Sequence, residues 1–209
     1  AAVSLAIRAL PGTVASNDTL WSGPFGDDYT ARNQHGRERR HIVRETVAEL
    51  QPLRLLEVGC NLGLNLRGIE GMVPRIVGVD VNHGALEQLR RVCPSVQAVV
   101  APAQRLPFLD GEFDLVVCIG VLIHIPTADL GAVMDELVRV TRGGGHILTG
   151  NYEAPEEVAV PYHGQEAALW KRPYHALFRE GRPVEAVWSK YLDAADGWDR
   201  VSFDFWRKR

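Results

Sequence analysis

The stretch LLEVGCNLGLNL, residues 55–66, decides the fold. It opens with an apolar run that predicts a buried strand and continues into a turn that carries Gly59 and Gly63. Glycine at these positions permits a tight turn and a close approach of a ligand to the backbone. We expect a helix to begin near Gly63, with unsatisfied N–H groups that face the ligand. A strand, a glycine turn and a helix in this order predict a ligand-binding loop.

Two classes of ligand fit such a turn. A dinucleotide-binding loop has the pattern G-x-G-x-x-G, which would require glycine at positions where this chain has Asn61 and Leu64. The other pattern is an acid followed by glycines at alternate positions, and here it reads Glu57, Gly59, Asn61, Gly63. This pattern resembles the class I S-adenosylmethionine-dependent methyltransferases. Asn61 replaces the middle glycine, and asparagine tolerates a positive φ better than most residues.

An acidic residue near the end of this apolar strand requires a partner. Glu57 would be costly to bury as a carboxylate unless a hydrogen-bond donor or a cation lies beside it. The amino group of an amino acid ligand or the amides of the turn would provide one.

Short apolar runs alternate with helical patterns on both sides of this stretch, which is typical of a parallel sheet covered by helices. The runs that predict strands are Leu53–Val58, Ile76–Val81, Val96–Val100, Phe113–Ile119, His146–Thr149, Val184–Tyr191 and Arg200–Trp206. Apolar stripes at helical spacing occur at residues 43–50, 85–93 and 129–141. We expect the last two strands to close the sheet with an antiparallel member, and Gly143–Gly145 to end the last helix. The pattern predicts a doubly wound, mostly parallel seven-stranded α/β sheet with helices on both faces, a Rossmann-like fold.

The chain reads as one domain over residues 1–209, because Pro and Gly are spread through the turns and no linker interrupts the pattern. We expect residues 1–50 to form a helical N-terminal lid and residues 53–150 to form the cofactor-binding core. Residues 151–209 would then supply an acceptor-side segment and the closing strands.

Composition limits the partners. The chain has 209 residues, with 23 Lys and Arg against 26 Asp and Glu and a formal net charge of -3. A protein that binds nucleic acid usually carries a basic excess, so we expect no such partner. Three cysteines without a CxxC spacing predict neither a disulfide framework nor a zinc site. No run approaches the roughly 20 apolar residues of a membrane span, so we expect no membrane partner. The first residues lack the features of a signal peptide, and we expect a cytoplasmic protein. We expect it to be a monomer or a homodimer.

Two more motifs extend the resemblance to the methyltransferases. Asp80 ends the second predicted strand, where a carboxylate can accept hydrogen bonds from both hydroxyls of a ribose. Residues 101–126, APAQRLPFLDGEFDLVVCIGVLIHIP, resemble the region after the third and fourth strands. There Ala103 would meet the adenine edge, and Pro102 stands where many relatives carry an Asp for the adenine amino group. The cofactor-binding residues that the resemblance implies are Glu57, Gly59, Cys60, Asn61, Gly63, Asp80, Val81, Ala103, Ile119 and Gly120.

Three segments resemble a narrower family, the methylases associated with pseudaminic acid biosynthesis. They are WSGPFGDDYTARN at residues 21–33, GVLIHI at 120–125 and VPYHGQEAALWKR at 160–172. The resemblance implies that the N-terminal lid and the segment after the fifth strand hold the acceptor. A lid suits methyl transfer, which requires water to be excluded and the acceptor to be aligned. The acceptor-binding residues expected are Trp21, Asp28, Arg32, Asn33, Tyr152, Tyr162 and Arg172.

Three side chains are candidates for catalysis: His124, Tyr29 and His163. His124 follows the fourth strand, on the side of the sheet where open α/β folds bind ligands, and it would draw the proton from the acceptor. A locally satisfied core histidine is an equal reading of the same pattern. Tyr29 or Trp21 would face the cationic sulfur, and Arg32 or Arg172 would anchor an acidic acceptor.

The sequence therefore predicts an enzyme of the EC 2.1.1 class with S-adenosylmethionine as its cofactor and no metal, although Asp27, Asp28 and Asn33 offer oxygen ligands. The acceptor would be a small polar metabolite of biosynthesis, methylated on oxygen or nitrogen: a sugar acid, an amino or amidino sugar, or a related intermediate of secondary metabolism. Two alternatives stay open, a methyltransferase acting on RNA or protein and a cofactor-binding protein without transferase activity.

Overall fold

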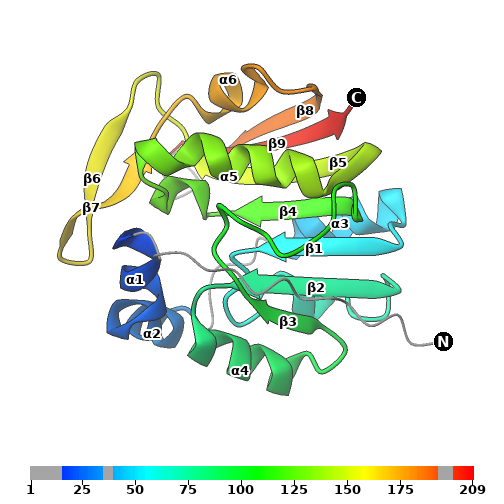
Figure 1. Ribbon diagram of the computed structural model, residues 1–209, viewed down its shortest axis with the longest axis horizontal. Helices are drawn as coiled ribbons and strands as arrows, with labels where there is room; N and C mark the ends of the chain where they lie inside the picture. The colour runs from blue at the N-terminus through cyan, green and yellow to red at the C-terminus, as the bar shows by residue number, and fades with distance from the viewer. Residues whose placement is uncertain (1–15, 35–39, 193–199) are drawn as a thin grey trace.

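The computed structural model describes residues 16–34, 40–192 and 200–209. Its centre is a seven-stranded sheet in the order β3-β2-β1-β4-β5-β9-β8, accompanied by a separate hairpin of β6 and β7 (Figure 1). The strands are β1 (Arg54–Val58), β2 (Arg75–Asp80), β3 (Gln97–Val100), β4 (Phe113–Ile119), β5 (Thr141–Tyr152), β6 (Val158–Tyr162), β7 (Gln165–Lys171), β8 (Val184–Leu192) and β9 (Val201–Lys208).

The sheet has the mixed topology that the sequence predicts. β3, β2, β1, β4 and β5 are all parallel, and β9 runs antiparallel to both β5 and β8. β1 lies in the middle of these five parallel strands, where Glu57 pairs with Gly78 of β2 and with Val117 of β4. The carboxyl ends of β1, β2 and β4 therefore meet at one edge. The predicted Rossmann-like fold with antiparallel closing strands is confirmed.

Helices cover both faces of the sheet. They are α1 (Ser16–Ser22), α2 (Pro24–Arg32), α3 (Arg40–Leu50), α4 (His83–Val92), α5 (Thr127–Val140) and α6 (Tyr174–Arg179). Val43 of α3 and Leu89 of α4 are fully buried in one apolar cluster, and Leu137 of α5 and Phe178 of α6 are buried in another. Each helix turns an apolar stripe to the sheet, which is the arrangement that the periodicity predicts.

Two predicted boundaries are wrong. No α-helix follows Gly63; the chain makes turns and then the short 3₁₀ helix η1 (Leu66–Gly68). Asparagine and glycine are weak helix formers, and the side chain of Asn65 reaches back to Glu57 instead of facing solvent. The helix α5 ends at Val140, before Gly143–Gly145, which were expected to end it; these glycines lie within β5, where the partners of Phe113 and Leu115 jump from Thr141 to His146.

The hairpin of β6 and β7 was not predicted as strands. It lies outside the main sheet, at the end to which the parallel strands point, and α1 and α2 lie at the same end (Figure 1). A second 3₁₀ helix, η2 (Leu122–His124), follows β4 at this end. Segments that are distant in the sequence thus surround the carboxyl ends of the central strands, where open α/β folds bind ligands.

Candidate functional site

The glycine turn after β1 is held to the neighbouring strand by its backbone. The amides of Gly59 and Cys60 both donate to the carbonyl oxygen of Val79, at 2.8 and 3.0 Å. Gly59 has a φ of 70° and Asn61 a φ of 46°. A Cβ on Gly59 would lie 2.2 Å from Cγ2 of Val121, so no larger residue fits there without movement. Asn61 thus adopts the positive φ that asparagine tolerates better than most residues.

Asp80 lies at the end of β2 and is fixed by the backbone around it. The amide of Asn61 donates to Oδ2 at 2.8 Å and the amide of Asn82 donates to Oδ1 at 2.9 Å. Burial raises the pKa of Asp80, and the hydrogen bonds from these amides oppose that shift. Each carboxylate oxygen accepts one amide hydrogen and keeps a lone pair for a further donor.

Glu57 is buried beneath the turn and is 2% exposed. The side-chain amide of Asn65 donates to Oε1 at 2.6 Å, while Oε2 has no hydrogen-bond partner among the described residues. Burial raises the pKa of Glu57 to about 8. The partner expected for this acid is therefore an asparagine side chain, and at neutral pH the carboxyl group is mostly protonated.

A cavity lies where β1, β2 and β4 end, and its space together with the open solvent at its mouth is about 760 Å³. Of the residues predicted to bind cofactor, those that line it are Gly59, Asn61, Asp80, Val81, Ala103, Ile119 and Gly120. Glu57, Cys60 and Gly63 lie behind this wall and do not line the cavity. None of the described lining residues is a Lys or Arg. The cavity is thus mostly apolar, with Asp80 as one of its few charged groups.

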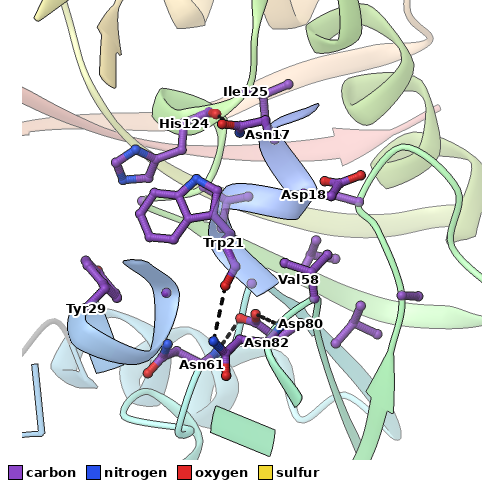
Figure 2. A pocket seen from close by; sticks show the side chains of 18 of the residues that line it. Asn17, Asp18, Trp21, Tyr29, Val58, Asn61, Asp80, Asn82, His124 and Ile125 are labelled. Atoms are coloured by element: carbon purple, nitrogen blue, oxygen red, sulfur yellow. Dashed lines mark hydrogen bonds between the residues drawn. The ribbon is translucent and has the colours of Figure 1, made fainter. Parts of the chain in front are cut away.

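The two N-terminal helices close one side of the cavity, as Figure 2 shows for Trp21 and Tyr29. The Asn82 side chain donates to the carbonyl oxygen of Trp21 at 3.1 Å and to Asp27 Oδ1 at 2.9 Å. The Asn61 side chain donates to the Thr30 hydroxyl at 2.8 Å. The lid is therefore hydrogen-bonded to the same two loops that fix Asp80.

Five aromatic side chains meet above the cavity, and we call them the aromatic cluster: Trp21, Phe25, Tyr29, His124 and Tyr162. The indole of Trp21 lies 5.2 Å from the rings of Phe25 and Tyr29 and 4.4 Å from the imidazole of His124, measured between centroids. His124 in turn lies 5.1 Å from Tyr162 of the hairpin. The lid, η2 and the hairpin thus contact one another through rings.

His124 is buried within this cluster and lines the cavity (Figure 2). Its Nδ1 lies 2.5 Å from the carbonyl oxygen of Ala168 in β7, so Nδ1 carries the hydrogen and Nε2 keeps a lone pair. The side-chain amide of Asn17 donates to the carbonyl oxygen of His124. Burial lowers the pKa of His124 to about 4, and the imidazole is therefore neutral at physiological pH.

Arg172 does not lie where the predicted anchor for an acidic acceptor must lie. Its side chain is fully buried, with Nη1 donating to the carbonyl oxygen of Ile125 at 2.9 Å and Nε donating to Glu157 at 2.6 Å. Nη2 donates to the Thr127 hydroxyl at 3.1 Å. These bonds join the end of the hairpin to η2 and the start of α5. The sequence prediction is wrong here because Arg172 directly follows β7, where its guanidinium is buried by hydrogen bonds to other segments and does not face a ligand.

Other predicted residues also lie away from the cavity. Asp28 and Arg32 are exposed on α2, and the side chain of Asn33 donates to the Tyr29 carbonyl oxygen at the end of that helix. His163 is exposed at the turn of the hairpin, and Tyr152 packs against the two cores. None of these is among the described residues that line the cavity.

Nine lining residues are not among the predicted site residues: Asn17, Asp18, Gly26, Val58, Val79, Asn82, Ala101, Val121 and Ile125. Asn82 could have been found, because an asparagine just before a helical stripe is a typical N-cap, and its Oδ1 does accept from the amide of Ala85. Asn17 and Asp18 precede the recognised lid motif, and nothing in a single sequence marks them.

Comparison with known proteins identifies the central part of the chain. Residues 56–149 match a family described as a methyltransferase domain. This match agrees with the predicted enzyme class and with S-adenosylmethionine as the predicted cofactor. The narrower resemblance to the pseudaminic acid methylases is not part of this match.

Two curated methyltransferases are similar over part of their length. A demethylmenaquinone methyltransferase of Beutenbergia cavernae is 29% identical over 102 residues, which are 49% of this chain and 42% of the relative. A malonyl-[acyl-carrier protein] O-methyltransferase of Legionella pneumophila is 34% identical over 132 residues, 58% of this chain and 45% of the relative. The chain thus spans less than half the length of these relatives.

A solved structure agrees with the fold over almost the whole chain. The 1,6-didemethyltoxoflavin-N1-methyltransferase of Burkholderia thailandensis, with bound 1,6-didemethyltoxoflavin and S-adenosylhomocysteine, has a TM-score of 0.69 and 17% sequence identity. The superposition covers 95% of this chain and 93% of that one.

The described residues fit the cofactor in their chemistry. An apolar cavity with a fixed carboxylate at the end of the second strand suits an adenosine. Within residues 16–34, 40–192 and 200–209, no three His, Cys, Asp or Glu side chains are placed to hold a metal ion. In the same ranges, none of the helices has the length and apolar character needed to cross a bilayer.

Proposed function

We propose that this protein is an S-adenosylmethionine-dependent methyltransferase that methylates an oxygen or nitrogen of a small polar acceptor. The observation that carries the proposal is the presence, in one cavity, of the fixed carboxylate of Asp80 and the neutral imidazole of His124. The first suits the ribose of the cofactor and the second suits an acceptor that must lose a proton.

Residues at the sheet edge would hold the cofactor. The remaining lone pairs of Asp80 accept from the two ribose hydroxyls, while Val81 and Ala103 provide apolar walls for the base. Ile119 and Gly120 line the cavity after β4, near the aromatic cluster. When bound, S-adenosylmethionine supplies a methyl group that is already activated on a sulfonium. The chain therefore needs to align the acceptor and remove its proton.

The aromatic cluster would hold the acceptor. The lone pair on Nε2 of His124 accepts the proton of the acceptor hydroxyl or amine, and the Ala168 carbonyl oxygen keeps the ring in this tautomer. The ring faces of Trp21 and Tyr29 attract a cationic centre, and the lid excludes water from it. Tyr162 contacts His124 from the hairpin and would limit the size of the acceptor.

The charge of the cavity favours some acceptors over others. The described lining contains Asp18 and Asp80 but no Lys or Arg, and the guanidinium of Arg172 is bonded elsewhere. A carboxylated acceptor would find no counter-ion there. Among the acceptors that resemblance to the pseudaminic acid methylases suggests, an amino or amidino sugar fits better than a sugar acid.

A planar ring is a second candidate acceptor, because the aromatic cluster offers ring faces for stacking. The names of two similar proteins point the same way: one acts on demethylmenaquinone and the other holds 1,6-didemethyltoxoflavin. Such an acceptor would carry a hydroxyl or ring N–H within reach of His124.

The test begins with calorimetric titration of S-adenosylhomocysteine and, separately, of NAD. We expect saturable binding of the first and none of the second, since the turn lacks two of the three glycines of a dinucleotide loop. Methyl transfer from labelled cofactor is then measured with amino sugars, hydroxylated ring compounds and sugar acids. Transfer to the first two classes with little to sugar acids supports the proposal.

Two results would replace the proposed function with another. Transfer confined to bulk RNA or protein would indicate a macromolecule methyltransferase. Tight binding of the cofactor without product in any of these pools would indicate a cofactor-binding protein. Both experiments use the wild-type protein, and sedimentation in the same buffers decides between a monomer and a homodimer.

A further inference from the structure

Beside Asp80, an apolar part of the cavity suits a purine base, and we call this part the slot. Val81 follows Asp80 directly, and Ala101 and Ala103 follow β3, so three small or apolar side chains line the cavity there. Since the base is joined to the ribose, and Asp80 is the carboxylate proposed to hold the ribose, this slot is where the base lies if the proposed function is correct.

The side chains of the segment after β3 provide little to recognise the edge of a base. It reads Ala101-Pro102-Ala103-Gln104, and Pro102 has neither a polar side chain nor an N–H. Any side chain that distinguishes one purine from another must therefore come from Gln104 or from another element. The lid helix α1 provides one, because Asp18 lines the same cavity and is only 6% exposed.

Asp18 and Gln104 contact each other at this place. The side-chain amide of Gln104 donates to Oδ2 and Oδ1 of Asp18, at 3.3 and 3.5 Å. The other end of that amide, Oε1 of Gln104, is buried and has no hydrogen-bond partner among the described residues. Asp18 thus presents carboxylate oxygens to the cavity, and Gln104 supports it from behind; in Figure 2 the carboxylate of Asp18 lies on the opposite side of Trp21 from Tyr29.

We infer that Asp18, supported by Gln104, recognises the exocyclic amino group of adenine, so that the lid and not the segment after β3 selects the base. This inference rests on the proposed function. A buried carboxylate selects a donor, and the amino group at C6 is the donor that adenine has at this position and hypoxanthine lacks. Hypoxanthine would instead place its 6-carbonyl oxygen against the carboxylate of Asp18, so that two acceptors face each other with no hydrogen between them.

The position of Asp18 joins base recognition to the lid. Asn82 and Asn61 hold the lid on the loops that fix Asp80, through Trp21, Asp27 and Thr30. A ligand with the correct base therefore adds a hydrogen bond to the lid, and the wrong base does not. Selection of the cofactor and closure of the acceptor chamber then depend on the same helix.

The experiment compares S-adenosylhomocysteine with its 6-oxo analogue, S-inosylhomocysteine, by calorimetric titration. We expect the wild-type protein to bind the adenine compound about 10- to 100-fold more tightly, the range for a hydrogen bond to a charged group. Asp18→Asn should reduce this preference to about threefold or less, because a carboxamide can turn its N–H₂ to a carbonyl oxygen. Glu45→Gln is the matched control: it removes one negative charge from an exposed position on α3.

The outcomes separate this inference from the proposed function. If the wild-type protein binds neither compound, the proposed function fails. If it binds both with equal affinity, or if folded Asp18→Asn keeps the wild-type preference, the proposed function stands and the role of Asp18 is wrong. Should Asp18→Asn not fold, as judged by circular dichroism, Gln104→Leu replaces it. Its expected loss of preference is at least threefold, and an unchanged preference contradicts the inference.

Discussion

The two sides of the cavity are built in different ways. On the cofactor side, Asp80 and the glycine turn belong to loops that directly follow neighbouring parallel strands, and backbone amides fix them. On the acceptor side, the lid, η2 and the hairpin meet through side chains: the aromatic cluster and the guanidinium of Arg172. Strand register determines the first arrangement, whereas packing between distant segments determines the second. A change on the acceptor side should therefore impair turnover or stability and leave the cofactor side intact.

The largest expected effect is that of His124→Asn. If Nε2 accepts the acceptor proton, its loss lowers kcat by about 10²- to 10⁴-fold, the usual range for a general base. The Kd for S-adenosylhomocysteine should change by no more than about threefold, because the proposed cofactor contacts lie on the other side of the cavity. Single-turnover methyl transfer and calorimetry measure the two quantities.

The pH dependence provides a second readout for His124. Burial lowers the pKa of this residue to about 4, so the imidazole keeps its lone pair at every pH above that value. The wild-type rate should then decline only as the pH approaches 4, without a limb near 6.5. His83→Asn, an exposed change at the start of α4, is the control. If the wild-type rate declines near pH 6.5, or if His124→Asn keeps the wild-type kcat, His124 is not the base.

Arg172→Met has the next largest expected effect, on stability. The methionine keeps the apolar stem, but the carbonyl oxygen of Ile125 and the carboxylate of Glu157 lose their donor. Removing one partner of a buried charged network costs about 3 kcal/mol of unfolding free energy. Urea unfolding measures this loss, and calorimetry on the folded variant should show a nearly unchanged Kd for S-adenosylhomocysteine.

Arg32→Met is the control for this experiment. Arg32 is exposed on α2, and a surface change of this kind alters the unfolding free energy by less than about 0.5 kcal/mol. If both variants lose similar stability, the hairpin is not held by Arg172. If Arg172→Met instead abolishes cofactor binding while remaining folded, the two sides are not independent.

This contrast also explains what could be predicted from the sequence. The strands, the parallel order and the turn from Glu57 to Gly63 follow from local patterns, because apolar runs, glycines and a terminal acid are adjacent in the chain. The positive φ of Asn61 follows in the same way. Most of the cofactor side of the cavity could therefore be predicted from the sequence.

The acceptor side could not be predicted from the sequence, because it depends on contacts between segments that are distant in the chain. Whether Arg172 faces a ligand or bonds to Ile125 depends on the hairpin, which is built from a polar and aromatic segment without clear alternation. Asp18 enters the cavity only because the lid docks on Asn61 and Asn82. The expected helix after Gly63 failed for a related reason, since Asn65 bonds to Glu57 and not to solvent.

The smallest expected effect concerns Glu57→Gln and the pH dependence of stability. The pKa of Glu57 is about 8 in the folded protein, against 4.5 for an unperturbed glutamate. Between these values the unfolded chain releases the proton while the folded protein keeps it, so stability falls as the pH rises, by up to about 1.4 kcal/mol per unit. Below pH 4.5 and above pH 8 this contribution no longer changes.

The glutamine cannot ionise, and its carbonyl oxygen can still accept from Asn65. The unfolding free energy of Glu57→Gln relative to the wild type should therefore rise by about 2 kcal/mol between pH 5.5 and pH 7.5. Urea unfolding at both pH values measures it, with exposed Glu45→Gln as the control. The histidines titrate equally in each protein, so the difference isolates Glu57. If the unfolding free energies of the wild type and of Glu57→Gln depend on pH in the same way, Glu57 is ionised in the folded state. Its Oε2 would then accept a hydrogen bond that stabilises the carboxylate.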